Sequence, residues 1–130
     1  MKRLFILTTL IILTFACASA QKPYKVFIEL LGSSKILSSK VNVTVDFGQK
    51  KSVWNNNQVL VDENGKKIEF NSMVDAMNYF GKAGWEFEQA YVVTTGQQNV
   101  YHWLLSKSVL SDEELTEGFT TKGEYKEQNQ

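Results

Sequence analysis

The chain is short of the residues that build metal sites and disulfides. Its 130 residues include one cysteine, Cys17, and one histidine, His102. A zinc or copper site of the usual kind needs several cysteine and histidine ligands. We therefore predict no metal and no other cofactor. A single cysteine also leaves no pair for a disulfide within the chain, so the fold must be stabilised by packing.

No apolar run is long enough to cross a membrane as a mature helix. The longest, Leu4 to Phe15, follows two basic residues and precedes Ala18-Ser19-Ala20, whose small side chains suit a signal peptidase. We therefore predict that residues 1–20 are a signal peptide and that the mature protein begins at Gln21. The predicted location is the periplasm or the outside of the cell, with no stable membrane insertion after cleavage.

Cys17 leaves a second interpretation open. A lipoprotein signal would place an acylated cysteine directly after the apolar run, and Cys17 has that position. Thr14 and Phe15, however, stand where lipoprotein signals favour leucine and a small residue. Cleavage after Ala20 is the better match, and a lipoprotein anchored through Cys17 is the alternative.

The mature chain has no strong charge of either sign. Residues 1–20 hold two of the 14 basic and none of the 14 acidic residues, so the rest has a formal charge of −2. This balance argues against nucleic acid or an anionic membrane as a partner. The length suits one domain, predicted over residues 21–119. Residues 120–130 have few apolar side chains, and we expect a disordered polar tail there.

Alternating apolar residues predict the first strands. Tyr24 to Leu31 is apolar on both faces, which is typical of a central strand that ends before the turn-prone Gly32-Ser33-Ser34. Val41 to Phe47 alternates valines with polar residues and is expected to be half-buried. Asn64-Gly65 predicts a type I′ turn that joins 59–62 to 67–70 in a hairpin.

A helix is predicted from Ser72, whose hydroxyl can cap it while Asp75 completes a capping box. The predicted buried stripe consists of Met73, Ala76, Met77 and Phe80, with Tyr79 among the residues on the solvent side. Gly84 should end the helix in a left-handed conformation.

Strands are then expected from Trp85 to Thr94 and from Val100 to Lys107, paired through a turn at Gly96 to Asn99. Ser111 with Glu114 predicts a further short helix. The predicted fold is α+β: an antiparallel sheet of about four to six strands, one main helix on one face, and a short C-terminal helix.

The stretch from Met77 to Phe87 (MNYFGKAGWEF) resembles the helix, glycine, tryptophan-glutamate, strand signature of a family of small uncharacterised bacterial domains. The whole chain is also similar to small exported bacterial proteins of unknown function. The resemblance implies an antiparallel sheet with a helix packed on one face, and it implies no activity. Glu88 and Gln89 depart from the signature, in which apolar residues usually follow.

Catalytic motifs are absent, since no strand-turn-helix nucleophile elbow occurs. Glu86 and Glu88 would lie on the same side of one strand, roughly 7 Å apart at twice the strand rise. This spacing matches some carboxylate pairs of glycosidases. A small hydrolase or isomerase that uses Glu86, Glu88 and His102 is therefore the alternative function.

Aromatic residues favour binding over catalysis. Trp54 stands beside Asn55-Asn56-Asn57 in a polar loop, and Tyr101 and Trp103 share one face of the last strand while His102 faces the other way. The predicted function is an exported, non-enzymatic binding module for a protein, peptide or glycan. Its candidate binding residues are Trp54, Asn56, Tyr101 and His102.

The same alternation predicts which face is buried. We expect Trp103 to pack against the helix stripe. If Thr94 opposes Val100, Phe87, Tyr91 and Val93 share that face with Trp103; a slip of one residue mixes the two sets.

Overall fold

The computed structural model describes residues 21–34, 38–50 and 56–130. The predicted signal peptide, with Cys17, and the predicted binding residue Trp54 lie outside the described residues. The elements, in chain order, are β1 (Tyr24–Ser34), β2 (Val41–Asp46), α2 (Met73–Lys82), β3 (Glu86–Thr95), β4 (Gln98–Val109), the 3₁₀ helix η1 (Asp112–Leu115) and α3 (Lys122–Gln128). Among the described residues, no helix is long and apolar enough to cross a membrane.

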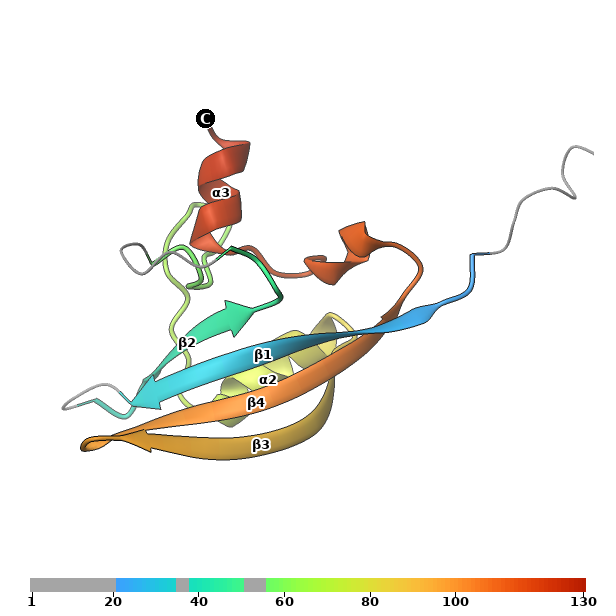
Figure 1. Ribbon diagram of the computed structural model, residues 1–130. Helices are drawn as coiled ribbons and strands as arrows, with labels where there is room; N and C mark the ends of the chain where they lie inside the picture. Colours follow the sequence, from blue (N-terminus) through green and yellow to red (C-terminus); the bar gives the residue numbers. More distant parts are fainter. Residues whose placement is uncertain (1–20, 35–37, 51–55) are drawn as a thin grey trace, which may run out of the picture.

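The strands form one antiparallel sheet in the order β2-β1-β4-β3 (Figure 1). This confirms the predicted α+β class and the internal position of β1. The sheet has four strands, because the segments 59–62 and 67–70 make only isolated bridges, such as Val61 with Lys67 and Val41 with Phe70.

The turn at Asn64-Gly65 is not the predicted type I′ turn. The Gly65 N–H donates to the Asp62 carbonyl at 2.9 Å, and the Asp62 N–H donates to the Lys66 carbonyl at 2.9 Å. Gly65 lies in the left-handed region, with φ 74°. The loop has three residues, because the Asp62 carboxylate accepts the Asn64 and Lys66 N–H groups at 2.9 Å each and holds the chain in a wider turn.

Both ends of α2 follow from local signals in the sequence. The Ser72 hydroxyl accepts the Asp75 N–H at 3.1 Å, as predicted. The Asp75 carboxylate reaches back to the N–H of Asn71 at 2.9 Å, whereas the predicted capping box required the N–H of Ser72. At the other end the Trp85 N–H donates to the Phe80 carbonyl at 3.2 Å. Gly84 has φ 88°, so the predicted left-handed helix end is confirmed.

The buried residues of α2 belong to the same hydrophobic cluster as those of the strands, and α2 runs behind the sheet in Figure 1. The fully or nearly fully buried members include Ile28, Leu30, Val43, Val45, Leu60, Ala76, Phe80 and Leu105. Met73 packs on Gly32, where a Cβ would come within 2.0 Å of its sulfur. This close packing explains why β1 continues through Gly32, which the sequence suggested as a turn.

Two further expectations are corrected by tertiary packing. Tyr79 was predicted to face solvent, yet its ring packs against Phe70 at 5.6 Å and Phe80 at 5.5 Å, and burial raises the pKa of its hydroxyl. Residues 120–130 were predicted to be disordered, yet they contain α3. Thr121 is 3% exposed and caps α3 in a capping box with Glu124. The predicted cap at Ser111 does not form, because its side chain makes no capping hydrogen bond to η1.

Candidate functional site

The face of the sheet opposite the core is the candidate site, which we call the open face. Alternation along β1 puts Ile28 and Leu30 in the core and Phe27 and Glu29 on the open face. The open face carries apolar side chains in solvent: Phe27 is 50% exposed and Val93 is 43% exposed.

The β3–β4 register decides which aromatic residues reach this face. Tyr91 lies opposite His102 and Val93 opposite Val100, so both are on the open face and not beside Trp103 as expected. The hairpin turn has two residues between Thr95 and Gln98. Thr94 therefore lies opposite Asn99 and not opposite Val100, a shift of one residue from the expected pairing. A bulge between Phe87 and Gln89 then returns Phe87 to the core side.

Tyr91, Glu29 and His102 form a polar cluster across β3, β1 and β4. The Tyr91 hydroxyl donates to Oε1 of Glu29 at 2.6 Å. The Tyr91 and His102 rings stack with centroids 4.7 Å apart and planes 12° apart. Nδ1 of His102 is 3.3 Å from the same Glu29 oxygen, without hydrogen-bond geometry. The Glu29 carboxylate therefore fixes the tyrosine, while this imidazole nitrogen makes no hydrogen bond with the described residues.

The electrostatics of the cluster follow from the shared carboxylate. Its hydrogen bond to the Tyr91 hydroxyl raises the pKa of that hydroxyl, because the neutral phenol is the donor. Tyr91 therefore remains a neutral donor throughout the physiological pH range. The His102 side chain is 16% exposed and that of Glu29 is 23% exposed, so both are shielded but reachable.

A second polar group lies on the open face, nearer the start of β3. The Glu88 carboxylate accepts hydrogen bonds from the Lys25 ammonium and the Ser106 hydroxyl. These donors lower the pKa of Glu88, since they stabilise its charged form. Glu88 is the extra residue of the bulge, since Phe87 and Gln89 pair with the consecutive residues Leu105 and Leu104 of β4.

The three sequence-predicted binding residues that the structure describes, Asn56, Tyr101 and His102, do not come together. Tyr101 lies opposite Gly32 on the core side and is partly buried, whereas His102 is on the open face. Asn56 is exposed in a loop beyond β2, where its carbonyl accepts the Val59 N–H at 3.4 Å. Of these three residues, only His102 belongs to the cluster described above.

The residues of the alternative enzyme site are also apart. Glu86 lies opposite Ser106 on β4, and four residues along a strand separate Ser106 from His102, about 13 Å at the usual rise. Glu88 is held by Lys25 and does not point to His102. Across residues 21–34, 38–50 and 56–130, no three His, Cys, Asp or Glu side chains are grouped as a metal site would require.

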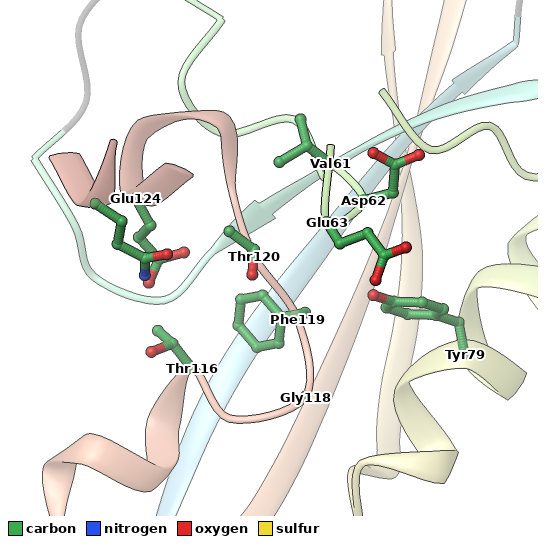
Figure 2. A pocket seen from close by; sticks show the side chains of 10 residues that line it. Val61, Asp62, Glu63, Tyr79, Thr116, Gly118, Phe119, Thr120 and Glu124 are labelled. Atoms are coloured by element: carbon green, nitrogen blue, oxygen red, sulfur yellow. The ribbon is translucent and has the colours of Figure 1, made fainter. Parts of the chain in front are cut away.

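A cavity of about 390 Å³ lies on another part of the molecule, between α2, the 62–63 turn and the segment before α3 (Figure 2). Phe119 lies in it, and Glu63 points toward the Tyr79 hydroxyl. Two of its carboxylates already accept backbone N–H groups: Asp62 in the turn and Glu124 at the start of α3. These two carboxylates are therefore engaged in holding the backbone of the turn and of the start of α3.

Comparison of the chain with protein-family models, curated proteins and solved structures finds no match. The candidate site therefore depends on geometry alone. Sequence reasoning missed Glu29 and Tyr91 as site residues. The signal for Glu29 was present, since it is the one acidic residue of the predominantly apolar strand β1. Tyr91 could not be assigned to this face before the register was known.

Proposed function

We propose that the mature chain is an exported, non-enzymatic interaction module that binds a protein partner through the open face of its sheet. The Tyr91–Glu29–His102 cluster among exposed apolar side chains carries this proposal. Aromatic residues combined with a few hydrogen-bonding groups are typical of protein interfaces, whereas small-molecule sites are usually concave pockets. Among the described residues, four surface cavities of about 290 to 630 Å³ are lined by residues outside this cluster.

Several features support the individual parts of the proposal. Export is supported by the signal-peptide pattern over residues 1–20. A binding role is favoured over catalysis because Glu86, Glu88 and His102 do not converge. We propose that α2 covers one face of the sheet and leaves the other face to a partner. This arrangement is supported by the single hydrophobic core that α2 and the strands share.

The test compares two lysine substitutions at exposed apolar residues. Phe27→Lys changes the open face, and Val74→Lys changes α2, where the side chain is 58% exposed. Each variant of the chain from Gln21 to Gln130 is immobilised and exposed to envelope proteins of the source organism. We expect a partner that wild type and Val74→Lys retain and that Phe27→Lys retains at least tenfold less.

A partner retained equally by all three proteins would contradict binding through the open face. A glycan array supplies the second arm of the experiment. Binding to a glycan that is abolished by Phe27→Lys, with no protein retained, would replace the protein partner with a carbohydrate.

A further inference from the structure

The two edges of the sheet differ in how their backbone groups are satisfied. The β2 edge is covered: the Val41 N–H donates to the Phe70 carbonyl at 3.0 Å, and the Val45 N–H donates to the Gln58 carbonyl at 3.0 Å. The β3 edge is open, since no segment of the described chain pairs with its outer side (Figure 1). All ten residues of β3 are exposed.

The open edge also lacks the features by which natural sheets prevent edge pairing. Such edges usually carry lysine, proline, an inward-pointing charge or a bulge. In β3 the bulge and both glutamates are confined to residues 86–88. The following seven residues, Gln89 to Thr95, have no charge and no proline. They extend about 20 Å at the rise of a strand, enough for several hydrogen bonds with another strand.

This segment is complementary to itself in antiparallel pairing. With Val92 opposite Val92 of a second copy, Tyr91 lies opposite the second copy's Val93, and Ala90 lies opposite its Thr94. Aromatic and β-branched pairs of this kind stabilise neighbouring strands. No like charges are opposed, because Glu88 would lie opposite Gly96 of the second copy, beyond the strand.

We propose that two copies of the chain pair antiparallel through β3, in a twofold dimer with one continuous eight-stranded sheet. A second copy is the favoured occupant because the segment matches itself. Assembly also stops at two, since the described part of each copy leaves one sheet edge unpaired, and the dimer occupies that edge in both copies. The open faces of the two copies then lie on the same side of the joint sheet, so their Tyr91–Glu29–His102 clusters are related by the twofold axis.

The test measures self-association of the chain from Gln21 to Gln130, which contains every described helix and strand. Sedimentation velocity is recorded from about 1 μM to about 1 mM, the range of weak protein association. We expect a concentration-dependent monomer–dimer equilibrium. Val92→Lys places two ammonium groups together at the twofold axis and should raise the Kd at least tenfold. Val74→Lys is the matched control on α2 and should leave the Kd unchanged.

A cysteine variant tests the register independently of charge. The chain after residue 20 has no cysteine, so Val92→Cys introduces the single thiol. Directly opposite residues of antiparallel strands have Cα atoms about 4.5 to 5.5 Å apart, within the range that a disulfide spans. Under oxidising conditions we expect a cross-linked dimer for Val92→Cys and much slower cross-linking for Val74→Cys.

Three results would overturn this proposal. The first is a wild-type chain that stays monomeric to about 1 mM. The second is a dimer that withstands Val92→Lys but dissociates with Phe27→Lys, which would place the contact on the open face. The third is growth beyond a dimer, which would require a second free edge. Circular dichroism of each variant shows whether it is folded, and the cross-linking of Val92→Cys decides the question if Val92→Lys does not fold.

Discussion

Replacing Gly84 with alanine tests the end of α2 most directly. Gly84 has φ 88°, a region where a Cβ costs roughly 1 to 2 kcal/mol. The added Cβ would meet Cε of Lys107 at 3.6 Å, an ordinary contact, so little steric cost is added. We therefore expect Gly84→Ala to lower the free energy of unfolding by about 1 kcal/mol, all of it from backbone conformation.

Gly81 in the same helix supplies a control with the opposite sign. It lies inside α2, and a Cβ there would have no atom within 4 Å. Alanine is favoured over glycine in a helix by up to about 1 kcal/mol, less near a helix end. Gly81→Ala should therefore raise the free energy of unfolding by about 0.5 kcal/mol. The two variants should differ by about 1.5 kcal/mol.

Urea unfolding followed by far-UV circular dichroism measures both changes. Tryptophan fluorescence suits this purpose less, because Trp85 is adjacent to Gly84. For a domain of this size, 1 kcal/mol corresponds to roughly 4 °C in Tm. A neutral or stabilising Gly84→Ala would refute the left-handed end of α2, whereas a destabilising Gly81→Ala would contradict only the expectation for the helix interior.

Four further predictions follow from other parts of the fold. In chemical unfolding, Trp103→Ala should lower the free energy of unfolding several-fold more than His102→Ala, because Trp103 packs against the core cluster while His102 is on the open face. Equal effects of the two substitutions would contradict this assignment of faces. The hydrogen bond from Lys25 lowers the pKa of Glu88 from its ordinary value of 4.5, so the charged carboxylate stabilises the fold above pH 4.5. This stabilisation is lost as the pH falls below that value, and Glu88→Gln should therefore flatten the acid side of a Tm-against-pH curve. An unchanged curve would contradict this role of Glu88. Thr121→Ala should cost about 1 kcal/mol through loss of the α3 cap, measured by urea unfolding, whereas no cost would support the disordered tail. The Tm should be the same with and without EDTA or reductant, and a decrease with EDTA would reveal a metal site.

Much of the local structure could be predicted from the sequence because its causes lie within a few residues. The Ser72 hydroxyl and the Asp75 N–H it caps are three residues apart, and Gly84 ends the helix through its own backbone conformation. Side-chain alternation likewise assigned Ile28 and Leu30 to one side of β1. Such signals act whatever the rest of the chain does.

The candidate site, in contrast, was decided by tertiary structure. Strand pairing changes by whole residues, and each shift of one residue moves a side chain to the opposite face. A two-residue turn placed Tyr91 opposite His102, and the pairing of β1 with β4 brought Glu29 to both.

The C-terminal residues carried a local helix signal, the Thr121–Glu124 capping box, but their packing against the domain depends on distant partners. The segment has few apolar residues, yet the Lys122 N–H donates to the Val59 carbonyl at 2.9 Å, and Leu60 pairs with Thr121. The sequence by itself determined the helix ends and the strand alternation, because these depend on near neighbours. Only the tertiary structure decided the open face, the β3 edge that no described segment covers, and the packing of residues 120–130, because each depends on partners far along the chain.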